Sequence, residues 1–370
     1  MVKETVRHYC TSSDDKIKIH HFAKLEWMIV KPFYLHNVED TVIRVAKKYW
    51  EDMINPNTDI PLTHDAYLKL YSLSDDVPKV DYLMVDEAND VNAVMVKIIE
   101  RFPNQTILVG DSFQNIYRFN RTVSILRTFD AKKMYLTKSF RFGDNVESFT
   151  NEVLSVLGAS KPLVGNGYKD GITYFVDVPN TYIPSAVLCR TNAGCIEALL
   201  DFTERYPELK ISTTVDFKQI SLIVNSYIAL SEGDMKNVKH PLLYAFKNID
   251  ELKEYLSDVT FADDLTKTCN LIDRFGAKRL LAIILNLGNN KHSPSEVDIL
   301  ITTAHKSKGL GFDNVTLYDD FIIKKGAVLS KDEINLFYVA VTRAKKCLDL
   351  SLVGDYVEHI RELLKGGSVK

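Results

Sequence analysis

The sequence predicts an α/β fold built on parallel sheets, with two domains in 370 residues. Short apolar runs at 82–85, 106–109, 186–189 and 297–301 each lead directly into polar or glycine-containing residues. Buried parallel strands deliver side chains in this way to the carboxyl edge of a sheet, where open α/β folds bind ligands. Segments of helix length separate the runs, as βαβ units require.

Composition limits the classes of function. With 46% hydrophobic and 26% charged residues, the sequence is typical of an ordinary globular protein. No apolar run approaches the roughly 20 residues that a membrane-spanning helix needs, and the first residues lead into no signal-peptide core. The five cysteines lack paired metal-ligand spacing, and their odd number fits reduced thiols. We therefore expect an intracellular protein without a membrane partner.

Apolar residues at helical spacing predict the main helices. Residues 42–53 form an amphipathic pattern whose aromatic side chains we expect in a core. Thr63 or Asp65 can cap a second helix over 63–70. Residues 217–290 are helical in pattern and rather acidic, which indicates an inserted helical subdomain.

Further elements follow from the rest of the pattern. Residues 134–136 predict a short strand, and a helix over 146–157 should stop at Gly158. Residues 332–344 are helical in pattern, and 347–352 predict an edge strand that closes the chain.

Two adjacent carboxylates, Asp86 and Glu87, follow the first apolar run. Asp86 suits contact with Mg²⁺, direct or through water, and Glu87 suits a base that polarises a water, as at NTP-hydrolysing sites. A strand followed by two acids is also often only the solvated start of a loop. The second run ends in Gly110-Asp111 and leads to Gln114, so two polar strand ends would share one edge, which favours a functional site.

Five motifs in order, between residues 86 and 344, resemble those of superfamily-one helicases of the UvrD/Rep type. Residues 86–90 match the family's Asp-Glu-Ala-Gln-Asp, and 109–117 match Val-Gly-Asp-x-x-Gln-x-Ile-Tyr. The fourth, fifth and sixth motifs are matched by 139–141, 303–310 and 338–344. Three further stretches are similar in sequence to the F-box DNA helicase branch: 63–70, 136–143 and 319–321. No F-box segment is visible in the sequence.

The resemblance implies two RecA-like parallel-sheet domains of the P-loop NTPase type, the first one incomplete, with small helical insertions. Residues 1–137 would form the first motor domain, with a helical insertion at about 33–78. Residues 138–216 and 296–370 would form the second motor domain, and 217–295 the inserted helical subdomain.

The resemblance also implies ATP-driven translocation on DNA, 3′ to 5′, with ATP and Mg²⁺ as cofactors and roles in repair and recombination. Asp86 and Glu87 would serve the metal and the water, and Gln114 would couple hydrolysis to domain closure. Arg141 and Arg343 would stabilise the charge that spreads over the γ-phosphate. The alternative for each arginine is a surface ion pair. The nucleotide contacts implied are Asp86, Gln114, Arg141, Gly309 and Arg343.

DNA contacts need a local groove, because the net charge of −3 excludes a generally basic surface. Tyr117 and Phe119 resemble the family's pair of base-stacking aromatics, and stacking of this kind is independent of base sequence. The alternative is that both rings pack in a core. The cationic side chains implied to face a single or partially duplex DNA strand are Arg190, His305, Lys306 and Lys308.

One required part of the family pattern is absent. A motor of this kind holds the β- and γ-phosphates in a G-x-x-x-x-G-K-[ST] loop, and no Gly-Lys dipeptide occurs in the sequence. Residues 18–23 resemble only a blurred form of the Thr-x-His block that follows this loop. We therefore expect an N-terminally truncated or split helicase. Its start would be missing through an interrupted gene or a misplaced start codon, or a partner polypeptide would supply the missing strand and loop.

Smaller departures keep a second hypothesis open. Asn89 replaces the family's glutamine, Asn120-Arg121 stand where Arg-Gly is usual, and Gly311 replaces a glutamate that would contact the nucleotide's ribose. These changes favour a relaxed nucleotide site. The alternative function is therefore a catalytically inactive single-strand-binding or regulatory protein. A soluble nucleotide-binding α/β protein unrelated to DNA is a third reading, which five ordered motifs disfavour.

Overall fold

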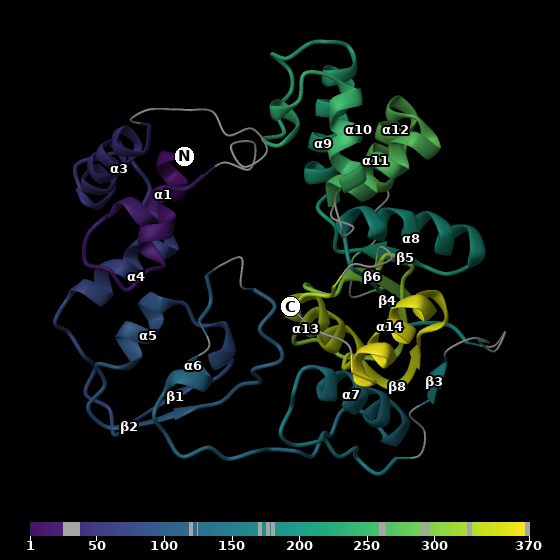
Figure 1. The fold of residues 1–370 in the computed structure, drawn as a ribbon, viewed down its shortest axis with the longest axis horizontal. Helices are drawn as coiled ribbons and strands as arrows, with labels where there is room; N and C mark the ends of the chain where they lie inside the picture. The colour runs from purple at the N-terminus through teal and green to yellow at the C-terminus, as the bar shows by residue number, and fades with distance from the viewer. Residues whose placement is uncertain are drawn as a thin grey trace. The chain divides into compact units, whose positions relative to one another are not determined.

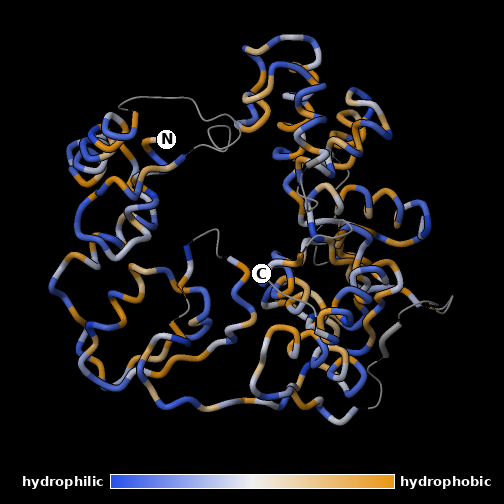
Figure 2. Tube along the Cα trace, in the orientation of Figure 1, coloured by the Kyte–Doolittle hydropathy of each residue, from blue (hydrophilic) through white to orange (hydrophobic). Residues whose placement is uncertain are grey.

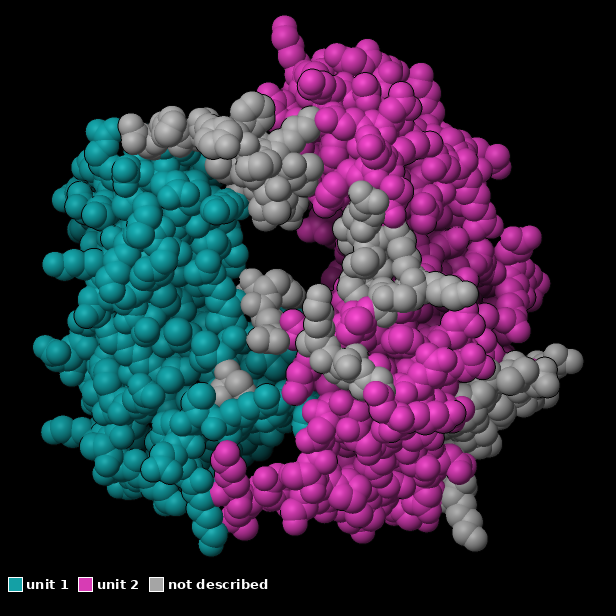
Figure 3. Space-filling view, in the orientation of Figure 1, with its two compact units in different colours: residues 1–132 teal, residues 133–370 magenta. Residues whose placement is uncertain are grey.

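The computed structural model describes residues 1–24, 38–117, 121–123, 125–168, 172–174, 178, 182–258, 264–289, 293, 296–323 and 328–366. The chain divides into two compact units, Met1–Lys132 (unit 1) and Lys133–Lys370 (unit 2), which Figures 1 and 3 show. Apolar and polar stretches alternate along the helices of both units, as amphipathic helices require (Figure 2). The motor-domain boundary at 137/138 stays a prediction.

In the described residues, the N-terminal part of unit 1 is built from α1 (Val2–Cys10), η1 (Ile19–His21), α3 (Val38–Ile54) and α4 (His64–Leu73). Their apolar faces share a core in which the Tyr9 and Trp50 rings meet edge to face, with centroids 5.3 Å apart. Thr63 caps α4, because its Oγ1 accepts the Ala66 amide at 3.2 Å. The predicted helices, core stripe and cap are confirmed.

The second part of unit 1 holds a two-stranded parallel sheet. Strand β1 (Tyr82–Val85) pairs with β2 (Gln105–Leu108), and the connection contains η2 (Ala88–Asp90) and α5 (Ala93–Ile99). Together with α6 (Ile125–Thr128), these elements pack against Leu83, Val85 and Leu108.

The other face of this sheet is open. Tyr82 is 59% exposed and Met84 62% exposed. The apolar run at 82–85 predicts a strand buried on both faces, as parallel strands usually are, and that expectation is wrong here. The physical reason is that the helices that pack on the strands cover only one face of the sheet.

Unit 2 contains a six-stranded parallel sheet of order β3-β8-β7-β4-β6-β5. The strands are β3 (Ile172–Tyr174), β4 (Ala186–Cys189), β5 (Ile211–Thr213), β6 (Ile299–Thr303), β7 (Phe312–Leu317) and β8 (Ala344–Asp349). Every residue of β4 is fully buried, since it pairs with β6 on one side and β7 on the other. The α/β fold with parallel sheets is confirmed.

Two strand predictions in unit 2 are wrong. The C-terminal strand was expected at an edge, yet β8 lies between β3 and β7. Residues 134–136 form no strand, and Met134 and Leu136 are 83% and 89% exposed. An apolar triplet needs a neighbouring strand to become part of a sheet, and the described residues place none beside it.

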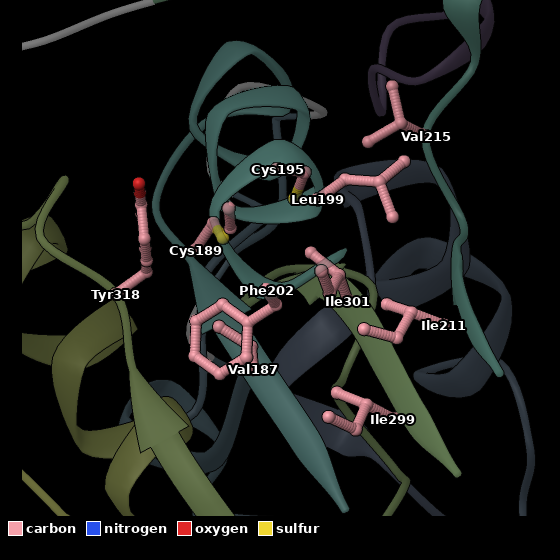
Figure 4. Packing of buried hydrophobic residues seen from close by; sticks show 11 residues of the cluster. Val187, Cys189, Cys195, Leu199, Phe202, Ile211, Val215, Ile299, Ile301 and Tyr318 are labelled. Atoms are coloured by element: carbon pink, nitrogen blue, oxygen red, sulfur yellow. The ribbon is translucent and has the colours of Figure 1, made fainter. Parts of the chain in front are cut away.

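Four helices pack around this sheet: α7 (Asp144–Val156), α8 (Asn192–Arg205), α13 (Lys331–Val341) and α14 (Gly354–Leu364). Helix α8 covers β4, β5 and β6, and Figure 4 shows the buried core between them, to which Val187 of β4 and Phe202 of α8 both belong. Helix α7 contacts α13 and α14. It ends as predicted, because Gly158 takes φ +76° and the Ala159 amide returns to the Leu154 carbonyl at 3.0 Å.

A group of helices lies in sequence between β5 and β6: α9 (Phe217–Ser231), α10 (Ile249–Asp258), α11 (Asp264–Phe275) and α12 (Ala277–Asn289). They pack on one another at one end of unit 2, and α11 also contacts α8 (Figure 1). The helical content predicted for 217–290 is confirmed, whereas the subdomain boundaries 217–295 stay a prediction. Among the described residues, no helix has the length and apolarity needed to cross a bilayer.

Candidate functional site

The carboxyl ends of β1 and β2 meet at one edge of the unit 1 sheet. Asp86 and Glu87 follow β1 directly, and Glu87 takes a left-handed backbone conformation with φ 48°. The Ala88 amide donates to the Val109 carbonyl at 2.9 Å, which holds this turn against the end of β2. Non-glycine residues rarely adopt such a conformation, and those that do cluster at functional sites.

Asn89 joins these acids to the strand end that carries Gln114. Asn89 is 1% exposed, and its Nδ2 donates to Asp90 Oδ1 at 3.0 Å and lies 3.5 Å from Glu87 Oε2. Its Oδ1 accepts the Asp111 amide at 3.0 Å, while Gln114 Nε2 donates to Asp111 Oδ2 at 2.9 Å. The structure thus brings Glu87 and Gln114 into one hydrogen-bonded network. The sequence pattern did not predict this role of Asn89.

The donor set at this edge fits a divalent cation. Asp86 and Glu87 are both exposed, and carboxylate oxygens are the ligands that Mg²⁺ prefers. The Glu87 amide donates to Asp86 Oδ1 at 2.8 Å, which orients that carboxylate. The edge therefore combines an oriented acid, a second acid on a constrained turn and a nearby amide.

Tyr117 lines a cavity of about 310 Å³ in unit 1. Burial raises the pKa of its phenol, and the nearby carboxylates of Asp90 and Glu87 raise it further. The ring is partly buried at the wall of this cavity, so it differs from a fully packed core residue. Phe119 lies outside the described residues. The other lining residues are Arg7, Thr11, Asp65, Asp90, Asn92 and Thr122.

In unit 2, the structure brings Arg141 and Arg343 to the same turn. Arg141 Nη1 donates to the carbonyl of Thr342 at 3.2 Å. Arg343 is 1% exposed; its Nε donates to the Val339 carbonyl at 2.8 Å and its Nη1 to the Leu310 carbonyl at 3.2 Å. Arg343 is thus buried among backbone carbonyls, whereas Arg141 is only partly buried. The alternative of a surface ion pair does not describe Arg343.

The fifth motif lies beside these arginines. Gly309 takes φ +81°, a conformation that favours glycine, and it leads into Leu310, whose carbonyl Arg343 holds. The backbone next to Gly309 is therefore fixed by a buried guanidinium on the sixth motif. Two motifs far apart in sequence form one local structure.

The comparison of sequences decides the family. The family described as UvrD-like helicase C-terminal domain matches residues 66–354. The chain belongs to the UvrD-like helicase family. The resemblance to UvrD/Rep-type superfamily-one helicases is thereby confirmed.

Relatives of this UvrD-like chain include DNA helicases. F-box DNA helicase protein 1 of Schizosaccharomyces pombe is 28% identical over 94% of this chain and 42% of its own length. F-box DNA helicase 1 of Gallus gallus is 30% identical over 98% of this chain and 38% of its own length. A probable DNA helicase II homolog of Mycoplasma pneumoniae is 23% identical over 74% of this chain and 54% of its own. The chain thus spans about two fifths of the F-box relatives' length.

Arg190 of the UvrD-like chain occupies a structural position. Its guanidinium makes a two-pronged ion pair with Glu333 of α13, at 2.9 and 2.6 Å. The amides of Arg190 and Thr191 donate to Asp320, a fully buried carboxylate whose pKa burial raises to about 6 despite these hydrogen bonds. Asp320 and Glu333 thus fix the turn after β4. A DNA contact by Arg190 stays a prediction.

The remaining predicted DNA-contacting cations follow β6. Lys306 is exposed, and its Nζ donates to the Thr214 carbonyl at 2.7 Å. His305 and Lys308 are partly buried on the same turn. The three side chains thus share one short segment of unit 2, at the carboxyl end of a central strand.

A third polar group, which the sequence pattern did not single out, surrounds Asp14 in unit 1. Its carboxylate lies 2.7 Å from His20 Nε2 and 3.2 Å from His21 Nε2, and Lys18 also binds it. The spacing suits a metal, but His21 does not: its Nδ1 accepts the Lys18 amide at 2.9 Å, so the proton of the neutral ring sits on Nε2. His21 Nε2 therefore donates, to Ser12 Oγ at 3.0 Å and to Asp14, and offers no lone pair.

His21 predicts an acid-sensitive unit 1. Burial, followed by the charge of His20, lowers the His21 pKa from 6.5 to about 4, while Asp14 opposes the shift. The unfolded chain therefore binds a proton between pH 6.5 and 4 that the folded chain does not, so stability falls as pH falls through this range, by about 3 kcal/mol. The charged groups facing the ring also include Lys69.

The measurement is urea unfolding at pH 7 and pH 4.5, followed by Trp50 fluorescence in a Trp27→Phe background. His21→Gln should flatten the pH dependence, whereas the exposed neighbour variant His20→Gln should keep it. Equal slopes for the parent protein and His21→Gln would show that His21 is not the responsible group.

Proposed function

We propose that this chain is the motor portion of an ATP-dependent DNA helicase that moves 3′ to 5′ on single-stranded DNA. The observation that carries the proposal is the Asn89-centred network, which ties Glu87 to the strand end that bears Gln114. The family membership and the names of the F-box relatives support DNA as the substrate.

Each residue has a distinct task in this mechanism. Glu87 accepts a proton from the attacking water, and its left-handed backbone conformation fixes the turn that carries it. Gln114 positions that water and registers the γ-phosphate through its network with Asp111. Arg141 stabilises the negative charge that develops on the phosphoryl oxygens, and Arg343 holds the backbone of the fifth motif in place. Asp86 and Glu87 would hold a Mg²⁺ ion, which would supply positive charge at the phosphates.

The proposal includes a phosphate-binding loop from another polypeptide segment. No Gly-Lys dipeptide occurs in the sequence, and the open sheet face of unit 1 exposes Tyr82 and Met84. A two-stranded sheet is marginal by itself, and a further strand beside β2 would complete it. Residues 1–370 alone should therefore show no ATP hydrolysis, and a chimera with a G-x-x-x-x-G-K-[ST] strand and loop joined ahead of residue 1 should show it.

The second candidate function is a catalytically silent single-strand-binding protein, which the missing Gly-Lys loop favours. ATP hydrolysis with and without single-stranded DNA distinguishes the two. Stimulation by DNA in the loop chimera supports the motor, whereas DNA binding without any hydrolysis in that chimera favours the silent protein. DNA-stimulated hydrolysis by residues 1–370 alone would contradict the loop proposal.

Tyr117→Ala should weaken binding of single-stranded DNA roughly 5- to 100-fold, because base stacking on an aromatic ring contributes about 1–3 kcal/mol. Fluorescence anisotropy with a labelled oligonucleotide measures the affinity, and the matched control is Tyr244→Ala, which removes an exposed ring in unit 2. Raising salt should weaken both proteins alike, since phosphate contacts set the salt dependence. Unchanged affinity for Tyr117→Ala would assign that ring to packing alone.

A further inference from the structure

Gly311 lies just before β7, and the side chains of Lys345 and Arg141 lie over it. Its φ is not in the left-handed region, so backbone freedom does not explain the residue. A Cβ at this position would lie 3.1 Å from Lys345 Cε and 3.4 Å from Arg141 Nε. The first distance is tighter than an ordinary contact and the second is at the lower limit of one, so the two side chains rest against the bare backbone of Gly311.

The two cations are therefore gathered at one spot of unit 2. Arg141 is held there by the Thr342 carbonyl, and Lys345 extends from β8, which follows the sixth motif. Like charges that share a site destabilise one another unless an anion joins them. The structure thus places a second positive charge beside an arginine already proposed to bind the γ-phosphate.

The neighbouring lysine shows that Lys345 is differently placed. Successive residues of a strand point to opposite faces, and Lys346 forms an ion pair with Asp313 at 2.8 Å. Lys345 is exposed and, among the described residues, forms no ion pair with an acid. Its ammonium is therefore available to an anion, whereas that of Lys346 is occupied.

We propose that Lys345 is a further phosphate-contacting residue of this helicase, and that the absence of a side chain at Gly311 lets it reach the triphosphate beside Arg141. This inference rests on the proposed nucleotide site and adds a residue to it. A lysine presents a compact charge on a flexible stem, which suits a phosphate that moves during hydrolysis. A carboxylate at position 311 would pair with both cations and occupy the same space.

The test is calorimetric titration of residues 1–370 with inorganic tripolyphosphate and with MgATP. Lys345→Met keeps the apolar stem against Gly311 and removes the charge, so it should weaken tripolyphosphate binding about tenfold, equivalent to about 1.4 kcal/mol. Lys345→Arg should stay within about threefold of the parent protein. Gly311→Glu should weaken binding at least as much as Lys345→Met. The matched control, Lys346→Met, should bind as the parent does.

The outcomes separate this inference from the proposed function. If Arg141→Ala weakens binding while Lys345→Met does not, Lys345 has no part in the site and the nucleotide site itself stands. Equal weakening by Lys345→Met and Lys346→Met would reveal a general charge effect and overturn the inference. A parent protein that binds neither tripolyphosphate nor MgATP would overturn this inference, whereas the proposed function, which takes its phosphate-binding loop from another segment, is tested separately by ATP hydrolysis in the loop chimera. Unchanged melting temperatures of the variants exclude loss of folded protein as the cause.

Discussion

Arg141→Ala should lower ATP turnover by about 10³- to 10⁵-fold in the loop chimera, with little change in the stability of unit 2. The expected size is that of an arginine that stabilises a phosphoryl-transfer transition state. The side chain is only partly buried, and its hydrogen bond to the Thr342 carbonyl is long at 3.2 Å, so its loss should leave the fold intact. Steady-state ATP hydrolysis measures the effect.

Two further arginine variants serve as comparisons for Arg141→Ala. Arg274→Ala removes an exposed arginine that pairs with Glu197 on the helical part of unit 2, and its turnover should equal that of the parent. Arg343→Ala should instead unfold unit 2 readily, because three backbone or hydroxyl oxygens lose a buried donor. If Arg141→Ala keeps a turnover within about tenfold of the parent, Arg141 does not stabilise the charge on the γ-phosphate.

Glu87→Gln should lower turnover by about 10²- to 10⁴-fold while leaving ATP affinity nearly unchanged. Glutamine keeps the shape and the long contact with Asn89 but does not accept the proton of water. Single-turnover hydrolysis and nucleotide titration, both on the loop chimera, separate chemistry from binding. Glu100→Gln, at the exposed end of α5, is the control and should change neither quantity.

A parent-like rate for Glu87→Gln would show that this carboxylate is not the base. A large loss of ATP affinity together with a modest loss of rate would instead assign Glu87 mainly to Mg²⁺. The distinction matters because Asp86 and Glu87 follow the same strand end, where the Glu87 amide already donates to Asp86 Oδ1.

Local signals in the sequence predicted most of the fold. The Thr63 cap and the Gly158 stop depend on residues a few positions away, and both are present in the structure. Apolar runs likewise predicted β1, β2, β4 and β6, because the hydropathy of a short segment is also a local property of the sequence. By contrast, the exposed segment 134–136 shows that an apolar run alone does not make a strand, because strand formation needs a partner.

The candidate site was predictable in its residue types but not in its contacts. The ordered motifs predict the acids, Gln114 and the arginines as site residues, and the structure groups them by unit. No local pattern indicated that Arg343 would be buried among carbonyls, or that Arg190 would pair with Glu333, since both depend on residues distant in sequence. The role that we propose for Lys345 likewise depends on its position over Gly311, which only the fold shows.

The central claim is that groups from both units act on one triphosphate. An ATP analogue with a photoreactive group on its γ-phosphate, bound to the loop chimera in the presence of single-stranded DNA, tests this directly. After cross-linking and peptide mapping, we expect label on residues 82–117 of unit 1 and on both 133–145 and 303–346 of unit 2. Label confined to one unit at saturating analogue would contradict the account.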